Sequence, residues 1–68
     1  MKFTVEYEQE EDGRWLAEVL ELPGVLAYGR TAEEAIAKVQ ALGLRVIADR
    51  IENGEETETL MSFAFVTA

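Results

Sequence analysis

The sequence predicts an α+β fold in the order β-β-β-α-β, with one long helix packed on a mostly antiparallel sheet. Three observations predict it. Residues 2–10 alternate strictly between apolar and polar side chains, as a half-buried strand does, and residues 14–20 read as a second strand, with Trp15, Ala17 and Val19 on one side and Leu16 and Leu20 on the other. Residues 32–52 carry apolar side chains at helical spacing, and residues 59–67 form a last apolar stretch. With 68 residues, the chain is expected to form a single domain, 1–68.

The length of the loop between the first two strands follows from the alternation of their side chains. A two-residue turn would place Tyr7 opposite Glu18, which sets an aromatic ring beside a charge. A three-residue loop, 11–13, instead places Tyr7 opposite Ala17 and keeps one face of the hairpin apolar. Gly13 then takes the left-handed conformation that such loops require. We therefore predict the three-residue loop.

Local signals define the connections to the third strand and to the helix. Pro23 and Gly24 suit a type II turn, because proline fixes φ at the second position and glycine accepts a positive φ at the third. Residues 25–30 follow as a short third strand. Thr31 is then expected to cap the helix, and Glu34, three residues on, to complete a capping box.

The predicted helix has one apolar stripe that should face the sheet. Its members are Ala35, Ile36, Val39, Leu42, Gly43, Val46 and Ile47. A glycine within a helix costs stability relative to alanine, so Gly43 is interpreted as a point of close approach between helix and sheet. Asn53 and Gly54 are expected to end the helix.

One helix covers only one face of such a sheet, which leaves apolar side chains without a partner. Those side chains, with two aromatic residues and one arginine, form the predicted partner or oligomer interface: Trp15, Leu16, Leu20, Tyr28, Arg30, Leu44, Ile51, Leu60, Ala64 and Val66. For Trp15 the simpler interpretation is packing within the sheet, and for Arg30 a solvated strand end. The sequence does not decide which alternate side chains of residues 60–66 face the helix.

The charge balance limits the kind of partner that the chain can bind. Fourteen acidic and six basic residues give a formal net charge of −8. Such a surface repels phosphate backbones, and no cluster of lysine or arginine offsets it, so direct binding to nucleic acid is not expected. A basic protein partner is electrostatically favoured. The alternative interpretation is that the acidity only keeps a small protein soluble.

The residue types exclude most enzymatic chemistry. There is no histidine or cysteine and a single serine, so a nucleophile with an orienting base cannot be assembled in the usual way. The acidic residues 9–13 lack the alternating ligand spacing of a calcium loop. We therefore expect no enzyme activity, no cofactor and no metal. A chain this small and without disulfides gains most from self-association, so a homo-oligomer is expected.

No apolar run approaches the ~20 residues that span a bilayer, and the first residues lack the apolar region of a signal peptide. The chain is therefore expected to be cytoplasmic, with no membrane contact.

An ordered set of short motifs carries a family resemblance. The set comprises the Asp-Gly pair at 12–13 with an aromatic residue two positions on, Leu-Pro-Gly at 22–24, and GRTAEEA at 29–35 opening a long helix. Over roughly residues 3–50 the chain resembles the N-terminal domain of HicB-family antitoxins. The resemblance implies a degraded RNase H-like fold without nuclease activity, which binds and neutralises a small basic toxin that cleaves mRNA.

Two functional hypotheses follow from the resemblance. In the first, the chain is a stand-alone HicB-like antitoxin that blocks its toxin by direct binding. In this hypothesis we expect the chain to lack the DNA-binding C-terminal domain of the family, so repression of an operon by this chain alone is not expected. In the second, it is a self-assembling HicB-like domain of unknown role with no toxin partner.

Overall fold

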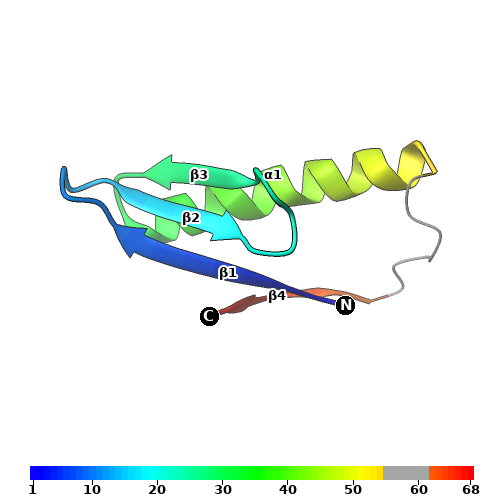
Figure 1. Cartoon of the computed structure of the whole chain (residues 1–68), viewed down its shortest axis with the longest axis horizontal. Helices are drawn as coiled ribbons and strands as arrows, with labels where there is room; N and C mark the ends of the chain where they lie inside the picture. Colours follow the sequence, from blue (N-terminus) through cyan, green and yellow to red (C-terminus); the bar gives the residue numbers. More distant parts are fainter. Residues whose placement is uncertain (55–61) are drawn as a thin grey trace.

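The computed structural model describes residues 1–54 and 62–68. Within them the elements are β1 (Lys2–Gln9), β2 (Trp15–Val19), β3 (Leu26–Gly29), α1 (Ala32–Glu52) and β4 (Ala64–Thr67). The predicted α+β class and the order β-β-β-α-β are confirmed. The sheet has four strands in the order β3-β2-β1-β4, and α1 has 21 residues. Figure 1 shows α1 running along one face of this sheet. The sheet is mixed, because β1 pairs antiparallel with β2 but parallel with β4.

The predicted hairpin register is confirmed. Tyr7 lies opposite Ala17, and Gly13 has a φ of 93° in the three-residue loop. The loop is closed by a backbone hydrogen bond of 2.7 Å from the N–H of Glu10 to the carbonyl of Arg14. Only the left-handed conformation of a glycine makes this loop without strain. The alternation of side chains was therefore sufficient to fix the loop length.

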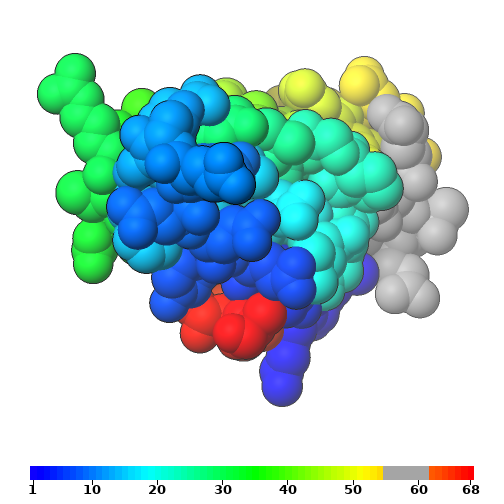
Figure 2. All heavy atoms as spheres, turned by 60° about the vertical axis from the view of Figure 1, so that its left-hand side comes forward, coloured from blue at the N-terminus to red at the C-terminus, as the bar shows by residue number. Residues whose placement is uncertain are grey.

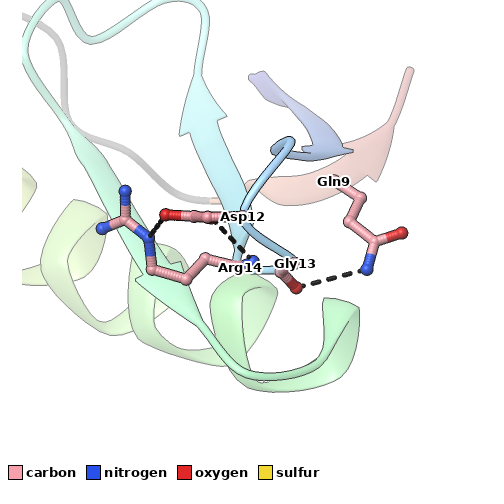
Figure 3. Close-up of polar contacts among 4 residues, drawn as sticks. All are labelled: Gln9, Asp12, Gly13 and Arg14. Carbon is pink, nitrogen blue, oxygen red and sulfur yellow. Dashed lines mark hydrogen bonds and ion pairs between the residues drawn. The ribbon is translucent and has the colours of Figure 1, made fainter.

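Side chains reinforce the tip of the hairpin (Figure 3). The backbone N–H of Arg14 donates to one carboxylate oxygen of Asp12 at 3.0 Å, and the Nε of Arg14 donates to the other at 2.8 Å. Gln9 donates from its side-chain amide to the carbonyl of Gly13 at 3.2 Å. The N–H of Arg14 is the main reason that the pKa of Asp12 is lowered from its ordinary value. These contacts fix the direction in which the Arg14 side chain leaves the loop.

The turn between β2 and β3 also has its predicted form. The N–H of Val25 donates to the carbonyl of Leu22 at 3.0 Å, and Gly24 between them has a φ of 85°. This is the geometry of a type II turn with glycine at its third position. The third strand begins at Leu26, one residue later than expected.

Both ends of α1 are capped as expected, with one difference. The N–H of Glu34 donates to the hydroxyl oxygen of Thr31 at 3.1 Å. The Glu34 carboxylate accepts from the backbone N–H of Arg30 at 3.4 Å, whereas a standard capping box would use the N–H of Thr31. At the other end, Asn53 is the C-cap and Gly54 follows with a φ of 71°.

The core lies between α1 and the sheet. Its buried side chains are Phe3, Val5, Ala17, Val19, Leu22, Val25, Ala35, Val39 and Ile47. The predicted helix stripe is confirmed, since its remaining members are buried or half-buried. The interpretation of Gly43 is corrected: an added Cβ there would meet Phe65 at 3.6 Å, which is ordinary contact. The tight approach is at Gly29 on β3, where a Cβ would lie 2.5 Å from the backbone nitrogen of Ala35.

The last strand is shorter than the predicted 59–67. Residues 59–61 lie outside the described residues, and positions 62 and 63 precede the strand, which begins at Ala64. The question of which side chains face the helix is answered by the register. Phe65 lies opposite Phe3 on the helix side, so Ala64 and Val66 point to the other face.

Glu21, two residues after the end of β2, forms hydrogen bonds to Thr4 on β1. Its carboxylate accepts from the backbone N–H of Thr4 at 2.6 Å and from the Thr4 hydroxyl at 2.7 Å. The backbone N–H makes the larger contribution and the hydroxyl the next, and together they lower the pKa of Glu21 from its ordinary value of 4.5. A carboxylate with a lowered folded-state pKa contributes stability above its unfolded pKa, and that stability is lost as the pH falls through the folded value.

We therefore expect the free energy of unfolding to fall on acidification below pH 4.5. In the variant Glu21→Gln, which keeps an acceptor for Thr4 but has no charge to titrate, that fall should be less steep. Urea denaturation at a series of pH values measures it. Glu11→Gln at the hairpin tip is the control and should follow the unaltered chain; equal slopes for both variants would show that Glu21 does not contribute to the acid sensitivity.

Candidate interaction surface

The face of the sheet that points away from α1 carries a row of apolar side chains. Leu20, Leu26 and Tyr28 are 47%, 43% and 39% exposed, and Leu16 beside Tyr28 is half-buried. On the far side of β1, β4 adds two more side chains to the same face. The apolar members are Leu16, Leu20, Leu26, Tyr28, Ala64 and Val66. No element of the described chain covers this face. A contiguous patch of exposed apolar side chains is typical of a partner surface, whereas apolar side chains exposed one at a time are ordinary.

Three glutamates lie among these apolar side chains. Glu6 on β1 is directly opposite Glu18 on β2, and Glu8 is opposite Leu16. Side chains paired across antiparallel strands have Cβ atoms about 4.5–5.5 Å apart, and like charges at such a pair are destabilising. Within residues 1–54 and 62–68, the structure gives none of the three carboxylates an ion pair. The Glu6–Glu18 pair therefore lowers the stability of the isolated chain. A cation supplied by a binding partner would remove this repulsion.

The glutamates also line an open hollow along β1, next to Ala68. It has a volume of about 550 Å³ and is lined by Glu6, Tyr7, Glu8, Leu16, Glu18 and Ala68. In Figure 2 the C-terminal residues, in red, lie against the blue residues of β1. We call the six apolar side chains together with Glu6, Glu8 and Glu18 the sheet face.

Arg14 stands at the hairpin end of the sheet face. Its guanidinium carbon lies 4.3 Å from the centre of the Tyr28 ring, a cation–π contact, and its Nε donates to the Asp12 carboxylate at 2.8 Å. The sequence analysis did not assign Arg14 to the surface. The signal was present, because Arg14 shares the alternation of Leu16, whose partner in the register is Tyr28.

The predicted interface residues divide among several places. Trp15 does not belong to the sheet face: it is half-buried on the helix side, packed against the core, with its ring centre 6.3 Å from that of Tyr7. Arg30 is exposed beside the start of α1. Leu44 and Ile51 lie on α1, 44% and 50% exposed, away from the sheet.

Among the remaining predicted residues, Leu16, Leu20, Tyr28, Ala64 and Val66 come together on the sheet face. Leu60 lies outside the described residues. Leu26 was missed, although it has the same alternation as Tyr28 on the same strand.

The chemistry available to this surface is binding by apolar contact and by attraction of cations. No group of three or more histidine, cysteine, aspartate or glutamate side chains in the described part of the chain could hold a metal ion. Among the same residues, no helix is long and apolar enough to cross a membrane.

Comparison of the chain with protein-family models, with curated proteins and with solved structures gave no match.

Proposed function

We propose that this chain is a non-enzymatic, cytoplasmic protein-binding module, a HicB-like antitoxin that neutralises a small basic mRNA-cleaving toxin by covering the toxin's active surface. The observation that carries the proposal is the sheet face, on which Glu6, Glu8 and Glu18 make no ion pair within the described residues and lie between exposed apolar side chains. The motif resemblance supports the identity of the partner. The β-β-β-α-β order agrees with the degraded RNase H-like fold that the resemblance implies.

The sheet face accounts for both steps of such binding. The net charge of −8 attracts a basic partner before contact, which raises the association rate. On contact, a lysine or arginine of the partner between Glu6 and Glu18 would relieve their repulsion. Burial of Leu20, Leu26 and Tyr28 would then set the lifetime of the complex.

The test is capture from a lysate of the source cell, followed by an RNA-cleavage assay of the captured protein. We expect a small basic protein at fixed stoichiometry, whose cleavage of RNA stops when the chain is added in equal amount. The association rate should fall as ionic strength rises. If the captured protein cleaves RNA equally well with and without the chain, the antitoxin function is wrong.

Glu18→Lys shows whether the sheet face is the surface used. This variant places a cation opposite Glu6, so its own fold should be retained while affinity for the basic partner falls by roughly tenfold or more. Glu52→Lys makes the same change in net charge at the end of α1 and should bind almost as the unaltered chain does. Equal weakening by both variants would indicate a response to net charge alone and would contradict the assignment of the sheet face.

The second candidate is a self-assembling HicB-like domain without a toxin. The exposed apolar side chains Leu44 and Ile51 on the far side of α1 favour it. Absence of any basic protein from the captured material, together with a defined oligomer, would favour this function over the first.

A further inference from the structure

The side of α1 that faces away from the sheet is apolar along most of its length. Its five residues, which we call the helix seam, are Ala37, Ala41, Leu44, Ala48 and Ile51. Every one of them is exposed. At 100° per residue they fall in a sector about 80° wide, roughly opposite the stripe that packs on the sheet. The solvent side of an ordinary surface helix is polar, so the helix seam is a feature without a role in the monomer.

The spacing of the helix seam is that of a helix-pairing surface. The five positions are separated by four, three, four and three residues, the alternation of the a and d positions of a coiled coil. Large and small side chains also alternate: Leu44 and Ile51 are 44% and 50% exposed, and alanines lie between them. Protruding side chains beside alanines provide knobs and shallow holes on the same helix.

This pattern is complementary to itself when a second copy runs antiparallel. With a two-fold axis near Val46, Leu44 of one copy faces Ala48 of the other, and Ile51 faces Ala41. Each of the two large side chains thus meets an alanine, and Ala37 lies beyond the paired layers. In a parallel pair, by contrast, Leu44 would meet Leu44 and each alanine would meet an alanine, which leaves the layers unevenly filled.

Charge separates the helix seam from the sheet face. A two-fold dimer places the same patch on both copies, so dimerisation through the sheet face would bring the three glutamates of one copy near those of the other, with Lys2 and Arg14 as the cations on that side of the sheet. The flank of the helix seam carries both signs, with Lys38 and Arg45 followed by Asp49 and Glu52. In the antiparallel arrangement Lys38 approaches Glu52 of the other copy, and Arg45 approaches Asp49. Like-charge repulsion therefore disfavours self-association through the sheet and not through the helix.

We propose that two copies of the chain form a dimer through the helix seam, with the two α1 helices antiparallel, while the sheet face stays open to a different partner. The contact is small. A 21-residue helix is ~31 Å long and ~10–12 Å wide, which is below the size of a standard protein interface. The dimer is accordingly weak, with a dissociation constant on the order of 10 µM. Self-association through the helix seam does not depend on whether a toxin exists.

Analytical ultracentrifugation over a range of concentrations tests the dimer. The unaltered chain should pass from monomer to dimer as concentration rises. Leu44→Glu should raise the dissociation constant at least tenfold with helix content unchanged, because glutamate is a good helix former at an exposed position. Leu20→Glu is the matched control, since Leu20 is 47% exposed on the sheet face; it should dimerise normally. Loss of the dimer in Leu20→Glu alone, or a monomer at millimolar concentration, would overturn the proposal.

Disulfide trapping tests the antiparallel arrangement, since the chain has no cysteine of its own. A mixture of the Leu44→Cys and Ala48→Cys proteins should oxidise to the mixed disulfide faster than either protein oxidises alone, because these Cα atoms must come within about 4.4–6.8 Å. Faster formation of the Leu44→Cys homodimer would indicate parallel helices and contradict the proposed packing. Both measurements use the chain without a partner. The dimer can therefore be disproved while toxin binding is confirmed, and toxin binding can be disproved while the dimer is confirmed.

Discussion

Replacing Phe3 by alanine is expected to lower the free energy of unfolding by roughly 3–5 kcal/mol. The side chain is 4% exposed, and its ring centre lies 5.9 Å from that of Phe65 and 6.4 Å from that of Phe63. The variant loses the transfer free energy of a whole aromatic ring and leaves a cavity between β1, β4 and α1. A small domain has only about 5–15 kcal/mol of stability, so the change removes a large part of it.

Urea denaturation measures the total effect, and amide hydrogen exchange locates it. The N–H of Ala64 donates to Met1 and that of Ala68 to Val5, so both report directly on the β1–β4 pairing. We expect these two amides to lose more protection than amides of the β1–β2 hairpin. Tyr7→Ala is the control: Tyr7 lies on the same strand and on the same side but is 44% exposed, so its truncation should cost about 1 kcal/mol or less. Equal costs for the two variants would contradict a core centred on Phe3.

The second large effect is expected at Gly29, where alanine should destabilise the fold by about 3 kcal/mol. The added Cβ would lie 2.5 Å from the backbone nitrogen of Ala35 and 3.0 Å from its Cα. Backbone atoms in the first turn of a helix cannot rotate away as a flexible side chain can. Either β3 or the start of α1 must move, which disturbs the hydrogen bond between Thr31 and Glu34.

Gly43→Ala is the matched control, because it makes the same chemical change on the other side of the same interface. Its Cβ would meet the Phe65 ring at 3.6 Å and the Leu22 side chain at 3.7 Å, both ordinary contacts. Alanine is favoured over glycine within a helix by ~1 kcal/mol, so this variant should be more stable than the unaltered chain. Thermal unfolding of the two variants should therefore shift in opposite directions. Shifts of the same sign would contradict the conclusion that the close approach of helix and sheet is at Gly29 and not at Gly43.

Most of the fold follows from short-range patterns in the sequence. The position of Tyr7 relative to Ala17 fixed the hairpin loop, and Thr31 with Glu34 fixed the start of α1. The last strand was harder, because residues 63–66 are apolar on both alternations. The large aromatic side chains determine which alternation faces the helix, since the rings of Phe63 and Phe65 pack with that of Phe3. The parallel pairing of β4 with β1 depends on contacts between distant parts of the chain, which no local pattern encodes.

The sequence analysis named five residues of the sheet face, Leu16, Leu20, Tyr28, Ala64 and Val66, but neither Leu26 nor the arrangement of the face. Exposed apolar residues were expected from the excess of apolar side chains over what one helix can cover. That Leu16 and Leu44 belong to opposite sides of the molecule follows only once α1 is placed on the sheet. The repulsive pair of Glu6 and Glu18 could be derived from the predicted register, since the pairing of Tyr7 with Ala17 requires it. Trp15 packs against the core, in line with the simpler of its two interpretations, because an aromatic side chain suits a core as well as a partner surface.

The parallel pairing of β1 with β4 governs the order in which the chain assembles. The amino group of Met1 donates to the carbonyl of Ser62 across 61 positions of sequence, whereas β1, β2 and β3 are joined by short turns. Closing a loop of that length costs roughly 4 kcal/mol of chain entropy, and a four-residue strand offsets it only when a surface is ready to receive it. We therefore expect the three antiparallel strands and α1 to form first and β4 to dock last. During synthesis the edge of β1 and the ring of Phe3 stay uncovered until residues 64–67 emerge, and in that interval the nascent chain is most exposed to pairing with the wrong strand.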